Sequence, residues 1–513
     1  MAEIEILRMI EGALIRRKED VVFFYGKAYS SATIVERYRS VARFLADNGI
    51  EEGDVVAVDL LNRPELLFII LGSWLVGASV TPINVQLKAE EIAYQLRSSG
   101  SRIVFAETGF REKINAAIDS SGTGTSAAIL DFDAADNGGA EYSRVFLEGA
   151  DYQPDPKNPQ VLFIIYTSGT TGKPKGAMLT SGNVFNEIIQ LQNVVNIREK
   201  DRMIIVLPLF HVNNLMFSLS FLMKGASMAI LRKFQSDEFF EYCEKYSPTM
   251  FSGVPTIYKM LVDAWTPERK EALRSIEVGI CGAAPMPIQW FEEFERLYGI
   301  KIMEGYGMTE GTVASTINPR YGVRKIGSIG IPFPGQDVRV FSDADESLPP
   351  GEIGEIVIRG PNVMKEYFNM PEETASTLRN GWLHSGDIGY MDPDGYFYIV
   401  DRKKDMIIRG GENVYPKEVE NQMISIPGVS EVAVIGRPDD VYGEEVIAFI
   451  ARKDDSLTAH DVLEYCRKNI AWYKSPKEVF FITEIPKNSV GKVSKPELRK
   501  MLKNRTLQGT GSE

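Results

Sequence analysis

Cysteine is scarce in this chain, which has three cysteines among 513 residues. Cys243, Cys281 and Cys466 lie far apart in the sequence and match no metal-binding spacing. Such sparse thiols fit a reducing compartment, so we expect a cytoplasmic location. We expect no signal peptide, because charged residues occur throughout residues 1–20.

Long apolar runs and an excess of positive charge are missing as well. The most apolar run, residues 66–80, is too short to span a bilayer, so we expect a buried core helix there and no membrane span. The formal net charge of -13 argues against nucleic acid as a partner. The composition, with 44% hydrophobic and 25% charged residues, is that of an ordinary globular chain, and its length predicts two to four structural units.

Helical and strand patterns alternate along most of the chain, which predicts a large N-terminal α/β domain of layered, mainly parallel sheets. A Gly-, Ser- and Ala-rich stretch at 122–139 is interpreted as a loop or linker. Helices are expected at 31–48, 65–77 and 184–195, and strands at 55–58, 104–105, 161–165, 204–206, 228–231 and 277–280.

The character of the sequence changes near Gly327, where frequent glycine, proline and short strand patterns predict a small β-rich subdomain. A charge cluster at 401–405 then separates two apolar strands. We therefore expect an N-terminal domain at 1–403 and a small α+β domain at 404–513. Its helices are expected at 415–424 and 460–469, and its strands at 432–435 and 446–450.

Residues 467–505 carry eleven Lys or Arg against three Glu, a balance of +8 in an acidic chain. This stretch is interpreted either as a solvated basic helix or as a surface for a small polyanion.

Glycines, hydroxyls and lysines gather in YTSGTTGKPKGAMLT, at 166–180, directly after the apolar run 161–165. Glycine lets backbone N–H groups face a ligand, while hydroxyls and lysine bind anions, so the stretch predicts a phosphate-binding loop. Its spacing differs from that of the common nucleotide P-loop. The alternative is a flexible linker. The candidate phosphate ligands are Thr167, Ser168, Gly169, Thr170, Thr171 and Lys175.

Six further segments follow this loop in the order found in one enzyme family. They are LPLFHV (207–212), GAAPMP (282–287), EGYGMTE (304–310), HSGD (384–387), DRKKDMIIRGGENVYPKEVE (401–420) and PKNSVGK (486–492). With the loop, the chain resembles the adenylate-forming superfamily of acyl-CoA synthetases, luciferases and adenylation domains. The resemblance implies a mobile C-terminal domain and ATP, Mg²⁺ and coenzyme A as cofactor and co-substrates.

The reaction implied by the resemblance has two halves. A carboxylate first displaces pyrophosphate from the α-phosphorus of ATP, and a thiol then displaces AMP from the acyl adenylate. Catalysis of the first half depends on positioning two anions and neutralising their charge. The resemblance assigns Lys492 to the reacting carboxylate and α-phosphate, with a surface lysine as the alternative. The resemblance assigns Glu310 to Mg²⁺, and a helix-capping pair with Thr309 is compatible with that role.

The resemblance assigns the adenosine contacts to three other segments. Tyr306 would lie against adenine, Asp387 would accept from the ribose hydroxyls and Arg402 would assist it. A turn is the alternative for both Tyr306 and Asp387. The remaining expected nucleotide contacts are Gly282, Ala283, Ala284, Pro285, Glu304, Gly305, Gly307 and Thr309.

The resemblance implies that His211 acts as an aromatic gate between the acyl pocket and the thiol path, with a structural histidine as the alternative. The expected acyl pocket also includes Val212, Asn213, Asn214 and Met216. This stretch holds no lysine or arginine, which disfavours a dicarboxylate substrate.

Lys404 is the expected hinge, because the family's C-terminal domain pivots there. Rotation of this domain would move Lys492 out of the site and bring Gly410 and Gly411 in. Pantetheine would then pass along the backbone of these two glycines. Tyr442 and Tyr473 are expected to stack on the CoA nucleotide, and Lys477 to bind its phosphates.

The sequence therefore predicts a ligase that makes acyl-CoA from a carboxylic acid, with a medium- or long-chain fatty acid as the leading substrate. An aryl acid is the first alternative. Loading of a carrier protein is the second, although no carrier domain follows in the chain. Luciferase-type oxidation and assembly as a homodimer stay open.

Overall fold

The computed structural model describes residues 5–17, 19–132, 140–147, 152, 154, 157, 159–167, 173–453, 456–487 and 493–503. Compactness divides the chain into two units: unit 1 holds residues 1–338 and 358–384, and unit 2 holds residues 339–357 and 385–513. The chain passes between the units inside strands. The predicted hinge at Lys404 lies within unit 2 and stays a prediction.

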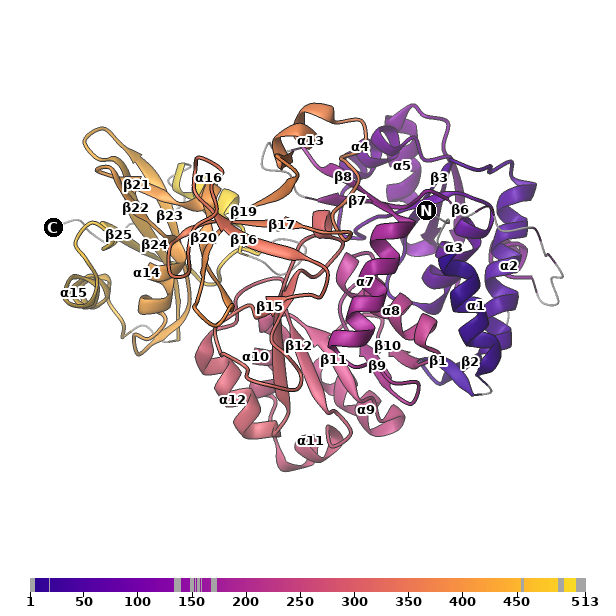
Figure 1. The fold of residues 1–513 in the computed structure, drawn as a ribbon, viewed down its shortest axis with the longest axis horizontal. Coiled ribbons are helices and arrows are strands. Elements are labelled where there is room, and N and C mark those ends of the chain that lie inside the picture. The colour runs from indigo at the N-terminus through magenta and orange to yellow at the C-terminus, as the bar shows by residue number, and fades with distance from the viewer. Residues whose placement is uncertain are drawn as a thin grey trace. The chain divides into compact units, whose positions relative to one another are not determined.

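In the larger sheet of unit 1, the neighbouring strands β1, β10, β9, β11, β12 and β13 run parallel to one another (Figure 1). The edge strand β2 pairs antiparallel with β1. Its strands, in sheet order, are β15 (Ile331–Pro332), β14 (Thr316–Ile317), β13 (Lys301–Tyr306), β12 (Val278–Cys281), β11 (Met250–Gly253), β9 (Arg202–Ile205), β10 (Ser227–Ile230), β1 (Asp20–Phe24) and β2 (Lys27–Ser30).

The second sheet of unit 1 ends in the hairpin that carries the predicted phosphate-binding loop. In sheet order its strands are β6 (Ser126–Leu130), β5 (Ile103–Glu107), β3 (Val55–Asp59), β4 (Ser79–Pro82), β7 (Val161–Thr167) and β8 (Lys175–Thr180). The interpretation of 122–139 as a loop is wrong at β6, because this small-residue stretch pairs in parallel with β5. Hydrogen bonds of the sheet outweigh the weak strand propensity of Ser and Ala. Residues 133–139 lie outside the described part.

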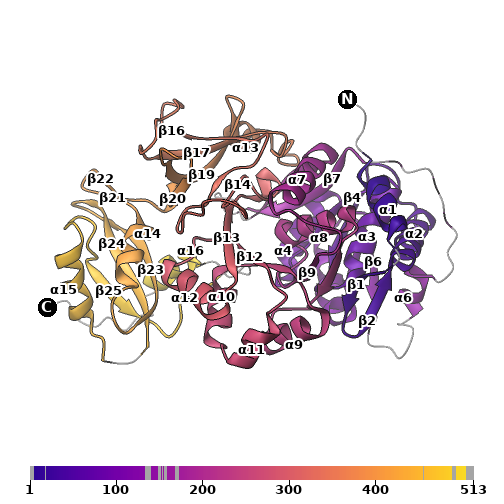
Figure 2. The ribbon, with the colours of Figure 1, turned by 60° about the horizontal axis from the view of Figure 1, so that its bottom comes forward.

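Helices of unit 1 cover both faces of the larger sheet. Figure 2 shows α9, α10 and α12 on the side of the larger sheet opposite to α7 and α8. The helices are α1 (Ile6–Arg16), α2 (Ser31–Asp47), α3 (Pro64–Leu75), α4 (Ala89–Ser99), α5 (Arg111–Ser121), α6 (Ala140–Val145), α7 (Ser181–Val194), α8 (Val212–Lys224), α9 (Ser236–Tyr246), α10 (Pro255–Asp263), α11 (Pro267–Ala272), α12 (Ile288–Tyr298) and α13 (Pro371–Thr377).

Strand β9 shows why both faces of the larger sheet are buried. Met203 and Ile205 join the apolar cluster that contains α8, whereas Ile204 and Val206 join the cluster that contains α9, α10 and α12. Successive side chains of a strand point to opposite faces, so a continuous apolar strand requires cover on both sides.

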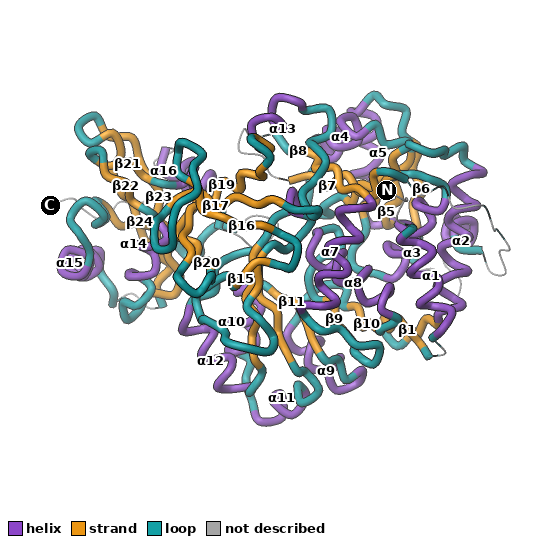
Figure 3. The backbone as a smooth tube through the Cα atoms, viewed as in Figure 1, coloured by secondary structure: helices purple, strands orange, loops and turns teal. Residues whose placement is uncertain are grey.

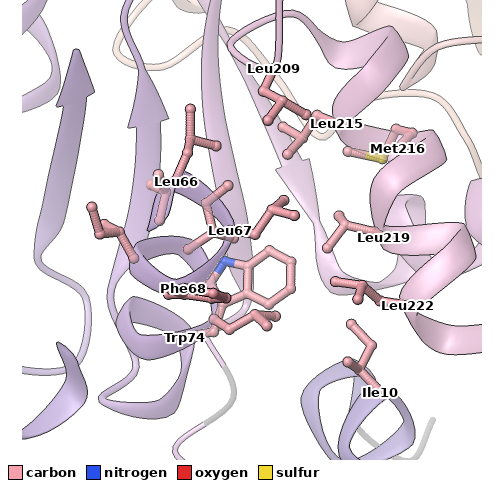
Figure 4. Packing of buried hydrophobic residues seen from close by; sticks show 14 of the residues in the cluster. Ile10, Leu66, Leu67, Phe68, Trp74, Leu209, Leu215, Met216, Leu219 and Leu222 are labelled. Carbon is pink, nitrogen blue, oxygen red and sulfur yellow. The ribbon is translucent and has the colours of Figure 1, made fainter. Parts of the chain in front are cut away.

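The predicted core helix at 65–77 is confirmed as α3, with every residue from Pro64 to Leu75 buried. Trp74 lies at the centre of the cluster in Figure 4, together with Leu66 and Leu67, and α8 contributes Leu219 and Leu222. The apolar run continues past the helix into β4, so its length reflects two buried elements. Within the described residues, no helix is both long and apolar enough to cross a membrane.

Unit 2 consists mainly of strands and loops (Figure 3). One sheet, whose strands carry the chain between the units, contains β16 (Asp337–Phe341), β17 (Gly354–Arg359), β19 (Trp382–Met391) and β20 (Phe397–Arg402), and β18 (Leu378–Arg379), which belongs to unit 1, adds to β19. The other contains β22 (Glu412–Val414), β21 (Ile407–Arg409), β24 (Gly443–Arg452), β23 (Val429–Asp439) and β25 (Glu478–Phe481). The helices are α14 (Pro416–Met423), α15 (Ala459–Asn469) and α16 (Lys495–Lys503).

Strand β24 is buried on both faces in the same way as β9. Val446 and Ala448 pack in the cluster with α14 and α15, and Ile447 and Phe449 pack in the cluster with α16. The predicted helices at 415–424 and 460–469 are confirmed as α14 and α15.

Candidate active site

The hairpin of β7 and β8 fixes both ends of the predicted phosphate-binding loop. Thr167, the last residue of β7, pairs with Lys175, the first residue of β8. Gly176 is required next to this pair, because a Cβ there would lie 2.8 Å from a methyl carbon of Ile164. Four predicted ligands fall outside the described residues: Ser168, Gly169, Thr170 and Thr171.

Helix α7 follows β8 directly and begins with a reciprocal cap. The Asn183 backbone N–H donates to Thr180 Oγ1 at 3.2 Å, and the Thr180 N–H donates to Asn183 Oδ1 at 2.9 Å. The cap satisfies N–H groups that the first turn leaves free and fixes where the helix begins.

Glu310 lies beside the hairpin, in a single helical turn at Thr309–Gly311. Its side chain is buried, and Oε1 accepts hydrogen bonds from Thr167 Oγ1 at 3.2 Å and Tyr367 Oη at 2.7 Å. No lysine or arginine among the described residues pairs with this carboxylate. A buried carboxylate held only by neutral donors is suited to a cation.

The described residues contain no group of three or more His, Cys, Asp or Glu that could hold a metal ion. A magnesium site with a full set of protein ligands is therefore not built in this part of the chain. Mg²⁺ commonly binds one or two carboxylates and completes its shell with water and phosphate oxygens. Glu310 fits that requirement, so the residues present are compatible with the predicted Mg²⁺.

The segments 282–285 and 304–307 lie side by side after two neighbouring parallel strands. Cys281 on β12 pairs with Glu304 on β13, and a Cβ on Gly282 would lie 3.2 Å from the Gly305 carbonyl oxygen. Glu304 is buried, and its Oε1 accepts from the Met286 N–H at 3.1 Å. The structure thus brings these two predicted adenine-binding segments together, while their contact with adenine stays a prediction.

Two backbone positions in these segments are restricted. Ala283 adopts a φ of 68°, a left-handed conformation that is uncommon for a residue other than glycine. Gly307 cannot be replaced without moving its neighbour, because a Cβ there would lie 2.0 Å from the Val313 carbonyl oxygen. The backbone around Tyr306 therefore packs directly against residues 313–314.

A buried carboxyl group supports that packing. Glu187 on α7 is fully enclosed, and its Oε1 accepts from the Ala314 N–H at 3.0 Å. Gln336 donates to the carbonyl oxygen of the same residue at 3.1 Å. Burial raises the pKa of Glu187 well above its usual range, an effect that the Ala314 N–H opposes. Sequence reasoning missed Glu187, which looks like an ordinary polar helix residue.

His211 immediately precedes α8, and its ring lies 4.5 Å from that of Phe210, centroid to centroid. The partly buried Asn213 accepts from Ser252 Oγ at 2.9 Å. Asn214 is buried and donates to the Leu207 carbonyl oxygen, and Met216 packs in the α8 core shown in Figure 4. The expected acyl-pocket residues thus divide: His211, Val212 and Asn213 are partly exposed, and the other two are fully enclosed.

In unit 2, Asp387 on β19 pairs with Arg402 on β20, and their side chains form an ion pair of 2.6 Å. Asp387 is buried, whereas Arg402 is exposed. The two predicted ribose ligands therefore lie together. Lys404 follows in the turn Lys403–Asp405, and Lys492 lies outside the described residues.

Gly410 and Gly411 form the turn between β21 and β22, with φ values of 61° and 86°. Both conformations are left-handed, so glycine is required by the turn itself. The Gly410 N–H donates to the Tyr442 carbonyl oxygen at 2.8 Å. The predicted CoA residue Tyr442 therefore lies directly beside the glycine turn.

A buried ion-pair network lies under this turn. The Glu445 carboxylate is fully buried and pairs with Arg409 at 2.8 Å and with the predicted phosphate ligand Lys477 at 3.0 Å. The Arg409 guanidinium also faces the rings of Tyr442 and Trp472, two residues that are 39% and 66% exposed. Tyr473 is partly buried against the adjacent core. Sequence reasoning missed Trp472, although it directly precedes Tyr473.

Comparison with known proteins identifies the class. Residues 13–368 match the family described as AMP-binding enzyme, and residues 418–492 match the AMP-binding enzyme C-terminal domain. The chain belongs to this family of AMP-binding enzymes. The predicted resemblance, fold class and enzymatic nature are confirmed.

Among curated relatives, the long-chain-fatty-acid–CoA ligase of Bacillus subtilis (strain 168) is 35% identical, over 93% of this chain and 90% of that protein. The feruloyl-CoA synthase of an Amycolatopsis species is 36% identical, over 93% of this chain and 94% of that protein.

Among solved structures, ATP-bound MatB from Rhodopseudomonas palustris matches with a TM-score of 0.90 and 32% identity, covering 97% of this chain and 99% of that chain. The o-succinylbenzoate CoA synthetase MenE of Bacillus subtilis, in complex with ATP and magnesium ion, matches with a TM-score of 0.84 and 28% identity. That match covers 96% of this chain and 99% of the other. These findings support the predicted use of ATP, Mg²⁺ and coenzyme A.

Proposed function

We propose that this protein is an ATP-dependent acid–thiol ligase that forms an acyl-CoA through an acyl adenylate and releases AMP and pyrophosphate. The observation that carries the proposal is the buried Glu310 carboxylate, which neutral hydroxyls hold beside the Thr167–Lys175 end of the hairpin. The Glu310 carboxylate and Lys175, beside a Gly- and Thr-rich loop, suit a nucleoside triphosphate and its cation.

In the first half-reaction, an oxygen of the substrate carboxylate forms a bond to the α-phosphorus of ATP and the bond to pyrophosphate breaks. Lys492 would reach both reacting groups and offset the charge that builds at phosphorus. Lys175 would hold the phosphates and Glu310 would hold Mg²⁺, which when bound neutralises phosphate charge. The Asp387 carboxylate, with Arg402, would position the ribose.

In the second half-reaction, the thiol sulfur of coenzyme A forms a bond to the acyl carbon and the bond to AMP breaks. Gly410 and Gly411 would let pantetheine pass along the backbone because they carry no side chain. Tyr442 and Tyr473 would contact the CoA nucleotide, and Lys477 its phosphates. His211 would separate the acyl pocket from the thiol path.

We propose a medium- or long-chain fatty acid as the substrate, which the 35% identity to a long-chain-fatty-acid–CoA ligase supports. An aryl acid is the second candidate. The partly exposed Asn213–Ser252 pair would suit a polar ring substituent, and the feruloyl-CoA synthase relative supports this reading. A cytoplasmic location and a homodimer stay predictions.

The test is pyrophosphate release from ATP with octanoate, palmitate, ferulate and malonate, each with and without CoA. We expect release with a fatty acid, conversion to acyl-CoA when CoA is present, and no release with malonate. Preference for ferulate would replace the fatty-acid proposal by the aryl one. Adenylation that never yields acyl-CoA would contradict the ligase proposal and favour loading of a carrier protein.

A further inference from the structure

Residues 364–368 add a short extended segment to the edge of β8. The segment and the strand share backbone hydrogen bonds of 2.8, 2.9 and 3.0 Å, and Tyr367 lies opposite Ala177 in an antiparallel bridge. The Met364 N–H also donates to the Glu310 carbonyl oxygen at 2.8 Å. The backbone at Tyr367 is therefore fixed both to the hairpin and to the turn that carries Glu310.

The Tyr367 side chain is 5% exposed, and its hydroxyl reaches the carboxylate of Glu310. The 2.7 Å hydrogen bond ends on Oε1, the same oxygen that accepts from Thr167. Among the described residues, Oε2 accepts no hydrogen bond. The two hydroxyls therefore orient the carboxylate and leave its second oxygen available to a cation.

The ring of Tyr367 faces a second candidate ligand. Lys175 is 7% exposed, and its Nζ lies 5.1 Å from the centre of that ring. Among the described residues, no carboxylate pairs with this ammonium. A largely buried ammonium without a carboxylate partner is suited to binding an anion. The face of the aromatic ring stabilises its positive charge while no anion is bound.

We propose that Tyr367 is a positioning residue that serves both ligands of the nucleotide at once. Its hydroxyl orients Glu310 for the divalent cation, and its ring supports Lys175 for the phosphates. The inference rests on the proposed nucleotide site. It adds a residue that lies outside every segment from which the site was predicted.

Two substitutions separate the two roles. Tyr367→Phe keeps the ring under Lys175 but loses the hydrogen bond to Glu310. We expect metal affinity to fall about tenfold, as is typical when the partner of a metal ligand is removed, with metal-free ATP binding unchanged. Tyr367→Leu removes the ring as well, and we expect it to weaken ATP binding in both conditions.

The measurement uses the full chain without any acid substrate, so that no adenylate forms. Binding of Mn²⁺ in the presence of ATP is followed by electron paramagnetic resonance, and binding of ATP is followed by calorimetry in EDTA and in excess Mg²⁺. Tyr298→Phe is the matched control, because Tyr298 is also 5% exposed and donates to a backbone carbonyl at 2.6 Å, in a different core cluster.

Weaker Mn²⁺ binding in Tyr367→Phe alone, with the control unchanged, would support the positioning role. Equal Mn²⁺ binding in wild type and Tyr367→Phe would overturn it, as would equal losses in Tyr367→Phe and the control. Failure of the wild-type protein to bind MgATP would instead contradict the proposed function. The three results are distinguishable.

Discussion

The residues of unit 1 that surround the predicted phosphate and Mg²⁺ site and the residues of unit 2 predicted for the thiol have very different surroundings. In unit 1, Glu310, Tyr367 and Lys175 are 6%, 5% and 7% exposed, and Tyr367 contacts both of the others. In unit 2, Tyr442 is 39% exposed beside the open glycine turn at 410–411. The first group is assembled from buried side chains, whereas the second combines the glycine turn with the exposed ring of Tyr442.

The difference teaches how one chain can serve two half-reactions. Stabilising charge on phosphates favours fixed groups in a dry site, which burial supplies. A thiol that must enter after the first step favours a passage without side chains, which glycine supplies. We therefore expect substitutions in the two regions to affect different halves of the reaction.

The largest expected effect is that of Lys492→Ala. Loss of a positioned donor to the transition state costs on the order of a hundredfold to a thousandfold, and we expect that loss in adenylation. Thioester formation from supplied acyl adenylate should be retained. Pyrophosphate release and acyl-CoA formation, measured separately, check both statements. Equal losses in both halves, in a variant that is folded by circular dichroism, would refute the assignment.

A smaller effect is expected for Gly411→Ala. The φ of 86° is unfavourable for alanine by about 1–2 kcal/mol, although no atom lies within 4 Å of the added Cβ. We expect thioester formation to fall about tenfold and adenylation to stay unchanged. Gly395→Ala is the matched control, with a φ of 85° and equally open surroundings. If both variants lose thioester formation alike, the turn has no special role.

The smallest expected effect concerns stability. Because the pKa of Glu187 is raised in the folded state, the unfolded chain loses this proton at lower pH than the folded chain. The free energy of unfolding should therefore fall as pH rises above the ordinary pKa, by up to about 1.4 kcal/mol per pH unit. Glu187→Gln keeps the acceptor for Ala314 and removes this dependence.

Melting temperatures from pH 5 to pH 8 check this expectation. The difference between Glu187→Gln and wild type should shift in favour of the variant as pH rises. The control Glu292→Gln alters an exposed carboxyl on α12. Parallel profiles for Glu187→Gln and wild type would show that the buried carboxyl is not held neutral.

Much of this arrangement could be predicted from local patterns. The strand at 161–165 and the helix from 184 became β7 and α7. Both depend on neighbours in the sequence, so periodicity indicates them. Glu310 and Asp387 were singled out only by the resemblance of the ordered segments to the family.

What could not be predicted depends on contacts between distant residues. Tyr367 meets Glu310 across 57 positions, and Glu187 meets Ala314 across 127. Both look like ordinary surface residues in the sequence, and only the packed fold encloses them. Strand β6 was missed for a related reason. Its extended conformation depends on pairing with β5 and is not indicated by its own composition.

The most direct test of the account measures both half-reactions in Glu310→Gln and Gly411→Ala. The amide of Gln still accepts from Thr167 and Tyr367 but lacks the charge that attracts Mg²⁺. We predict that Glu310→Gln loses pyrophosphate release and keeps thioester formation from supplied acyl adenylate, and that Gly411→Ala shows the opposite pattern. Loss of the same half-reaction in both variants would contradict the division of labour proposed for the two regions.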